Sequence, residues 1–213
     1  MKKLSPVLLI LFVCAMGCNM SSIKNLVSGG AGGKGTATGG SDPKADVIEA
    51  SKKFIALPFF TANMEGMGQT EIKSQVQFAA PDSFHVKYTG GTGAGMEIVY
   101  IGKNGYMKSG DKWTKMPDSG SIPNLRDSFT EEGLKSLSDV KYDGEDTVDG
   151  KPMSVYSYKN VTPVGAFPFT CKIWVNGAGV PAKIHAEYTN GVLKYMDVKY
   201  DTETPVKIEA PKI

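Results

Sequence analysis

The alternation of apolar and polar residues from residue 69 onwards is the feature that most limits how this chain can fold. Between Gln69 and Phe78 the apolar side chains fall on one side of an extended segment and charged or amide side chains on the other. The pattern resumes from Ser83 to Tyr88, after a turn at Pro81-Asp82. Because successive side chains of a strand point to opposite faces, these segments predict antiparallel strands with one dry and one wet face.

Short segments of the same type recur along the rest of the chain. They are residues 96–101, 105–108, 112–116, 140–148, 152–159, 169–175, 182–189 and 192–200. Lys103-Asn104-Gly105, Asp149-Gly150 and Asn190-Gly191 supply the residues of tight hairpin turns between them. The sequence therefore predicts a mainly β, α+β domain built from an antiparallel meander of roughly ten strands.

A glycine cluster at residues 89–95 has two readings. It could belong to a dinucleotide-binding loop, which requires a strand before it and a helix after it. Here strands are predicted on both sides. The cluster is therefore interpreted as a loose hairpin loop.

Two helices are predicted outside the meander. Residues 43–57 have apolar positions at a 3.6-residue spacing, begin at Asp42-Pro43 with a capping side chain and an N-terminal proline, and end before Pro58. A second short helical insertion is predicted within residues 122–138, where Gly133 weakens the pattern. Its apolar residues at near-helical spacing are Leu125, Phe129, Leu134 and Leu137.

This order of elements resembles the superfamily of the outer-membrane lipoprotein carrier, which includes LolA-like and LolB-like proteins and the mycobacterial LppX-like and LprG-like lipoproteins. The resemblance covers about residues 43–210. It rests on the N-terminal helix, the segment 99–106 followed by Lys112-Trp113, the helical insertion, and the segment 148–151 before the last strands. It implies an unclosed half-barrel with both helices on its concave face, around an apolar cavity that holds acyl chains.

The side chains expected to face inward are the candidate ligand-binding residues. They are Ile72, Val76, Phe78, Phe84, Val86, Tyr88, Ile98 and Tyr100. The alternative is that they form a filled core. A mouth loop at residues 161–169, with Val164, Phe167 and Phe169, either touches membrane or cargo or serves as a rigid connection.

The N-terminus reads as a bacterial lipoprotein signal. Lys2 and Lys3 precede the apolar run 7–13, which is too short to span a bilayer, and Ala15-Met16-Gly17-Cys18 resembles the site where a cysteine receives diacylglycerol. Cys14 is a poorer site because it follows the bulky Val13. An ordinary secretory signal is the alternative.

These features divide the chain into three parts: a signal peptide at 1–17, an acylated Cys18 with a flexible glycine-rich tether at 18–41, and a single domain at 42–213. The tether has a root-mean-square reach of about 25–30 Å. It lacks the preceding strand, the Gly-Lys-Ser/Thr ending and the helix of a phosphate-binding loop.

Charge and chemistry-bearing residues exclude several function classes. Loss of Lys2 and Lys3 would balance the 24 basic and 22 acidic residues, and the lysines are scattered, so a nucleic-acid surface is not predicted. His85 and His185 belong to no catalytic or metal motif, and both are expected to face solvent on strands. Cys171 is expected to be a buried core residue. We expect no enzyme activity, no metal and no cofactor.

The sequence thus predicts a lipid-anchored envelope protein, in a cell membrane or outer membrane, that binds an acylated or other apolar ligand. It would act as a receptor, a tethered relay or a sensor, because an anchored protein does not readily ferry cargo. The alternative is an anchored interaction or structural domain with a filled core, whose partners are envelope proteins.

Overall fold

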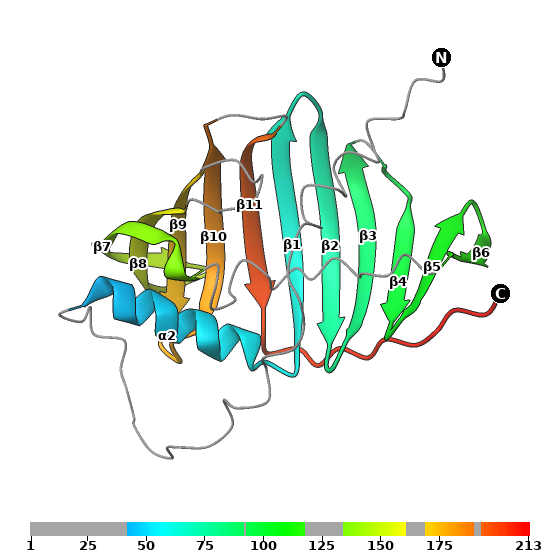
Figure 1. Ribbon diagram of the computed structural model, residues 1–213, viewed down its shortest axis with the longest axis horizontal. Helices are drawn as coiled ribbons and strands as arrows, with labels where there is room; N and C mark the ends of the chain where they lie inside the picture. Colours follow the sequence, from blue (N-terminus) through cyan, green and yellow to red (C-terminus); the bar gives the residue numbers. More distant parts are fainter. Residues whose placement is uncertain (1–41, 92, 118–133, 161–168, 190–192) are drawn as a thin grey trace.

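In the part of the chain that the structure describes, eleven strands form one antiparallel sheet with helix α2 against it (Figure 1). The computed structural model describes residues 42–91, 93–117, 134–160, 169–189 and 193–213. The elements are α2 (Pro43–Ile55), β1 (Phe59–Gly68), β2 (Glu71–Ala79), β3 (Ser83–Gly91), β4 (Glu97–Ile101), β5 (Asn104–Ser109), β6 (Lys112–Lys115), β7 (Leu137–Val148), β8 (Lys151–Asn160), β9 (Phe169–Asn176), β10 (Pro181–Tyr188) and β11 (Leu193–Asp201).

The sheet consists of two meanders joined at its centre. Its order is β6-β5-β4-β3-β2-β1-β11-β10-β9-β8-β7, so the first and last strands of the chain are neighbours. β1 and β11 pair antiparallel along most of their length, with Ala62 opposite Tyr200 and Met64 opposite Val198. β6 and β7 remain as the two edges. The predicted unclosed antiparallel half-barrel is confirmed.

Strand β1 was absent from the sequence prediction, although it lies in the middle of the sheet. It follows Pro58 directly, and its alternation of Phe60, Ala62 and Met64 with polar residues is diluted by Gly66 and Gly68. Small and glycine residues lower the strand propensity that a sequence pattern detects. The hydrogen-bonded pairing with β11 therefore stabilises β1 as a strand despite its weak local pattern.

Helix α2 begins as the sequence predicts and ends two residues earlier. The Asp42 carboxylate accepts hydrogen bonds from the backbone N–H groups of Lys44 and Ala45, both at 3.1 Å, and Ala56 is the C-cap. The buried residues Val47, Ala50, Ser51 and Phe54 form the predicted apolar stripe. This stripe packs on one face of the sheet, which we call the inner face.

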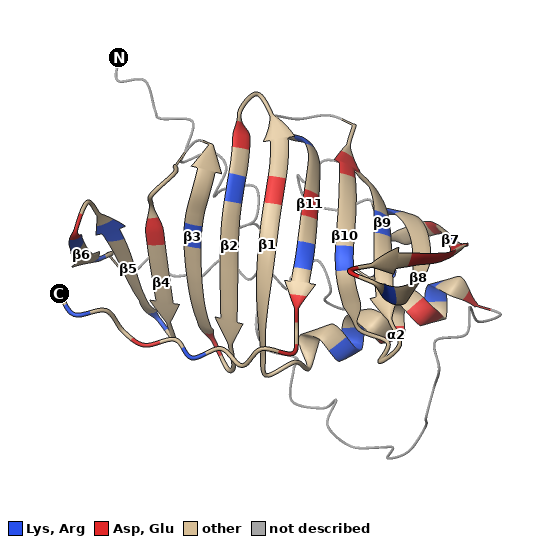
Figure 2. Ribbon diagram, turned by 180° about the vertical axis from the view of Figure 1, so that it is seen from behind, with Lys and Arg blue, Asp and Glu red and all other residues tan. Residues whose placement is uncertain are grey.

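The inner face holds the main hydrophobic core. Its buried members come from α2 and from strands of both meanders, and they include Phe54, Phe60, Val76, Ile173 and Val198. The opposite, outer face is mostly polar, apart from a small buried cluster of Met153, Val155 and Trp174. Figure 2 shows basic and acidic residues interleaved across its strands.

Two local predictions need correction. The turn between β4 and β5 is Gly102-Lys103, with Gly102 at φ 56°, whereas Asn104 and Gly105 already belong to β5. The helical insertion was predicted to reach residue 138, but Leu137 begins β7, because its backbone pairs with Asn160 of β8. Residues 118–133, where most of that insertion was predicted, lie outside the described residues. Asp149-Gly150 forms the predicted turn, with both residues at positive φ.

The glycine cluster begins within β3 and continues toward β4, and its described residues belong to a hairpin connection, as predicted. Backbone hydrogen bonds tie this connection to the strand. The Tyr88 N–H donates to the Met96 carbonyl, and the Gly95 N–H donates to the Tyr88 carbonyl, both at 2.9 Å. Gly91, Gly93 and Gly95 all have positive φ. The glycines therefore serve a folded turn between two strands.

Candidate ligand-binding face

The sheet register places all the predicted ligand-binding residues on the inner face. Val76 lies opposite Val86, which lies opposite Ile98. One step along the strands, Phe78 lies opposite Phe84, and Phe84 opposite Tyr100. Ile72 and Tyr88 share this face by the two-residue period of their strands. The side chains thus form a continuous apolar surface on β2, β3 and β4.

Burial divides these residues into two groups. Val76, Phe78, Phe84 and Ile98 are buried, with Phe78 at 0 % exposure. Ile72, Val86, Tyr88 and Tyr100 are only half-buried. The first group belongs to the packed interior, and the second group leaves apolar surface accessible on the inner face.

Helix α2 packs on the other half of the inner face, over β7 to β11 (Figure 1). The Phe54 ring contacts the rings of Phe60 and Tyr200, with centroids 4.9 and 4.7 Å apart. At the opposite end of the helix, the Tyr156 hydroxyl donates to the Asp46 carboxylate at 3.1 Å. The Lys44 ammonium donates to the Leu137 carbonyl at 2.9 Å. The described helix is therefore fixed over the second meander.

Tyrosines are concentrated on the inner face, a bias that the sequence prediction missed. Of the nine tyrosines, all but Tyr106 and Tyr195 share the face of the core residues by strand register. The two-residue period of each strand would have revealed this bias. The tyrosine rings thus add apolar surface to the inner face, and their phenol groups add many hydroxyls.

Cys171 lies among these tyrosines as the predicted buried core residue, at 1 % exposure. Burial raises the pKa of its thiol to about 12, while a hydrogen bond with Tyr158 acts in the opposite direction. Burial also raises the pKa of Tyr158. Because the thiolate is the reactive form of cysteine, Cys171 is an unreactive thiol in the folded chain.

Both histidines lie on the outer face, as predicted. His85 Nε2 lies 3.0 Å from a Glu97 carboxylate oxygen, and Lys108 donates to the other oxygen at 3.0 Å. Burial is the largest influence on His85 and lowers its pKa, although the bond to Glu97 opposes this. His85 is therefore held in place as a structural group.

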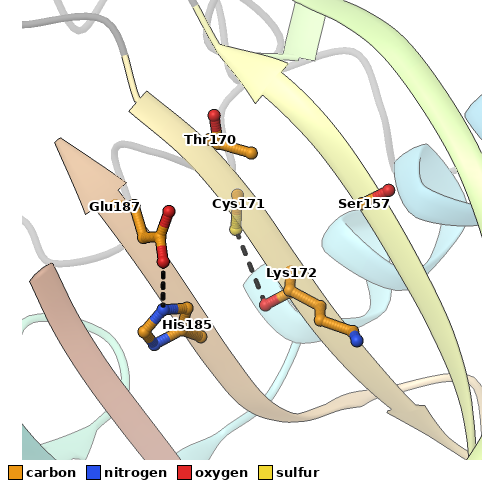
Figure 3. Close-up of a pocket in the computed structure, with 6 residues that line it drawn as sticks. All are labelled: Ser157, Thr170, Cys171, Lys172, His185 and Glu187. Carbon is orange, nitrogen blue, oxygen red and sulfur yellow. Dashed lines mark hydrogen bonds and ion pairs between the residues drawn. The ribbon is translucent and has the colours of Figure 1, made fainter. Parts of the chain in front are cut away.

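His185 borders a shallow depression of about 190 Å³ on the outer face (Figure 3). Its Nε2 lies 3.3 Å from Glu187 and its Nδ1 lies 2.9 Å from Asp197, so carboxylates occupy both ring nitrogens. The other lining residues are Ser157, Thr170, Cys171 and Lys172. The described lining residues carry charges of both signs, and carboxylates contact both ring nitrogens of His185. These residues do not form a recognisable catalytic group.

The described part of the chain has neither a metal-binding cluster nor a membrane-spanning helix. No group of three or more His, Cys, Asp or Glu side chains there is arranged to hold a metal ion. No helix among these residues has the length and apolar character needed to cross a membrane.

Comparison with known proteins rests on structure. No family model matches the sequence, and no curated protein matches it. Among solved structures, the lipoprotein LppX of Mycobacterium tuberculosis superposes with a TM-score of 0.62 at 14 % identity, covering 78 % of this chain and 98 % of LppX. LprF of Mycobacterium bovis gives a TM-score of 0.59 at 14 % identity, covering 79 % of this chain and 96 % of LprF. The chain has the LppX-type fold.

This structural likeness confirms the fold that the sequence resemblance implied, an LppX-type half-barrel. A further match is MucB in its complex with MucA from Pseudomonas aeruginosa, with a TM-score of 0.50 and 17 % identity. It covers 78 % of this chain and 59 % of the MucB chain.

The predicted mouth loop and lipidation site lie mostly outside the described residues. Val164, Phe167 and Cys18 are among the residues not described. Phe169 begins β9 on the inner face, where its ring lies 5.5 Å from that of Tyr188. Their roles in contacting a ligand or membrane stay predictions.

Proposed function

We propose that this chain is a membrane-anchored lipoprotein that binds an acylated or other apolar ligand on the inner face of its half-barrel. The observation that carries the proposal is the set of half-buried apolar residues on β2, β3 and β4, beside the half of the sheet that α2 packs against. An acyl chain gains about 0.8 kcal/mol for each methylene that it buries on such a surface. The protein would act as a receptor, a tethered relay or a sensor.

The anchor in this proposal is Cys18. Residues 1–17 direct export, Cys18 is acylated, and residues 18–41 tether the domain 42–213 to the cell membrane or outer membrane, on the periplasmic or external side. The fold shared with LppX, which is itself described as a lipoprotein, supports this location. The proposed partners are the membrane and a lipid or lipoprotein acyl chain, with an envelope protein as a further candidate; no enzyme activity or cofactor is proposed.

Val86→Trp should reduce bound lipid by at least about tenfold, because the indole occupies the half-buried surface between Val76 and Ile98 and removes the burial of roughly two methylenes. Val76 is a poorer site for this test, since it is 2 % exposed and tryptophan there would overpack the core. The measurement is lipid per mole of protein, extracted with organic solvent and quantified by mass spectrometry.

The matched control is Lys87→Trp, the next residue along β3, whose side chain is 45 % exposed on the outer face. This variant should carry as much lipid as the wild type. Equal lipid in the wild type and the Val86→Trp variant would place the ligand elsewhere. Absence of extractable lipid from the wild type would contradict the proposal itself.

Cys18→Ser should abolish acylation and release the protein from membranes. Incorporation of radiolabelled palmitate and the distribution between membrane and soluble fractions measure both effects. Cys14→Ser is the control and should leave labelling unchanged. Retained labelling in the Cys18→Ser variant would show that the anchor is not at Cys18.

The second candidate function is an anchored envelope-protein interaction domain with a filled core. The fold that the chain shares with MucB, solved as a complex with MucA, favours it. So does the direct packing of Phe54 against Phe60 and Tyr200, which closes part of the inner face. A wild-type protein without lipid that recovers one envelope protein after cross-linking in cells would support this candidate.

A further inference from the structure

Ser74 is a buried hydroxyl on the inner face with no visible partner. It is 8 % exposed, in the middle of β2. Among the residues that the structure describes, none forms a hydrogen bond with its side chain. A buried polar group without a partner costs about 1–3 kcal/mol, so such groups call for an explanation.

The surroundings of Ser74 are apolar. In the sheet register it lies between Met64 of β1 and Tyr88 of β3, and Ile72 and Val76 flank it on its own strand. Of these neighbours, Met64, Ile72 and Tyr88 are half-buried. The hydroxyl thus lies within the surface that the proposed function assigns to the ligand.

Two phenol hydroxyls near this surface also lack a hydrogen-bond partner among the described residues. Tyr100 of β4 and Tyr200 of β11 make no side-chain hydrogen bond with any described residue. The Tyr200 ring packs against Phe54 and Phe60, and burial raises the pKa of both phenols. Each hydroxyl therefore remains protonated and offers an O–H donor. Along the sheet, Tyr200 lies opposite Ala62, two strands and two residues away from Ser74.

We infer that the ligand carries an ester-linked acyl chain whose carbonyl oxygen accepts a hydrogen bond from Ser74. This inference rests on the proposed function and names the class of ligand: an acyl ester rather than a plain hydrocarbon or an ether lipid. An ester fits better than an amide because unpaired O–H donors need an acceptor, whereas an amide would add an N–H donor to an apolar site.

The test compares two probes that differ only in their carbonyls: a diacyl phosphatidylglycerol and the dialkyl ether phosphatidylglycerol of equal chain length. Each is titrated into the full acylated chain in one detergent, and native mass spectrometry measures the bound fraction. The wild type should prefer the ester probe by about three- to tenfold, the effect of one neutral hydrogen bond. In Ser74→Ala this preference should disappear while ether binding is unchanged.

Ser154→Ala is the matched control. Ser154 is also a buried inner-face serine, at 5 % exposure, but its side chain bonds with Tyr156. This variant should keep the ester preference. Its urea midpoint should fall, because a made hydrogen bond is lost, whereas that of Ser74→Ala should stay level or rise.

The outcomes separate the two claims. Binding of both probes with equal affinity by the wild type, or a preference that survives in Ser74→Ala, overturns the inference and leaves the proposed function standing. A clear fall in the urea midpoint of Ser74→Ala also overturns it, since Ser74 would then be a structural hydrogen-bond donor. Failure of both probes to bind overturns the proposed function and the inference with it.

Discussion

Gly91→Ala should lower the free energy of unfolding by about 3 kcal/mol, through two additive causes. Gly91 has φ 68°, a left-handed conformation that costs an L-residue about 1–2 kcal/mol. A Cβ atom at this position would also overlap the backbone carbonyl of Glu71 on the neighbouring strand. Backbone atoms cannot rotate away as a side chain can, so the start of β2 and the end of β3 must separate. Urea unfolding followed by circular dichroism measures the loss.

Gly95→Ala in the same loop is the matched control. Gly95 has φ 85°, yet a Cβ atom added there would have no described atom within 4 Å beyond its chain neighbours. Only the conformational cost of about 1 kcal/mol is expected. Equal losses in the two variants would show that the contact with Glu71 adds nothing to the effect of backbone conformation.

Phe54→Ala should cost about 3–5 kcal/mol, the range measured for truncation of a buried phenylalanine. Phe54 is 1 % exposed and joins α2 to the sheet through the rings of Phe60 and Tyr200. Its removal leaves a cavity at the end of the helix that packs on the core. The expected result is a lower urea midpoint and faster hydrogen exchange in α2.

Lys52→Ala, two residues earlier on the exposed side of the same helix, should change stability by less than about 0.5 kcal/mol. Both variants introduce alanine into the same part of α2, so they differ mainly in the burial of the side chain that is removed. A Phe54→Ala variant as stable as Lys52→Ala would mean that α2 is not docked on the inner face through this ring.

The parts of the fold that follow a local period were predictable from the sequence. The alternation in β2 and β3 placed Val76, Val86 and Ile98 on one face, and the register confirms that placement. The helical stripe of α2 was equally clear, because Asp42, Pro43 and Pro58 mark its limits. Both signals depend only on neighbouring residues.

The features that depend on distant residues were not predictable in this way. β1 has a weak local pattern and gains its place by pairing with β11 at the far end of the chain. The Ser74 hydroxyl, which has no partner among the described residues, also has no sequence signature, since a serine on the apolar side of a strand looks like an ordinary interruption. Its meaning depends on which residues surround it after folding.

The central claim is that the inner face holds an apolar ligand, and the mass of the intact wild-type protein tests it most directly. Native mass spectrometry of the full chain, purified from its host without added lipid, should show a species heavier than the acylated polypeptide by the mass of a lipid. Organic extraction should remove this added mass, and the Val86→Trp variant should lack it. A wild-type spectrum with only the acylated polypeptide, identical to that of Val86→Trp, would contradict the account.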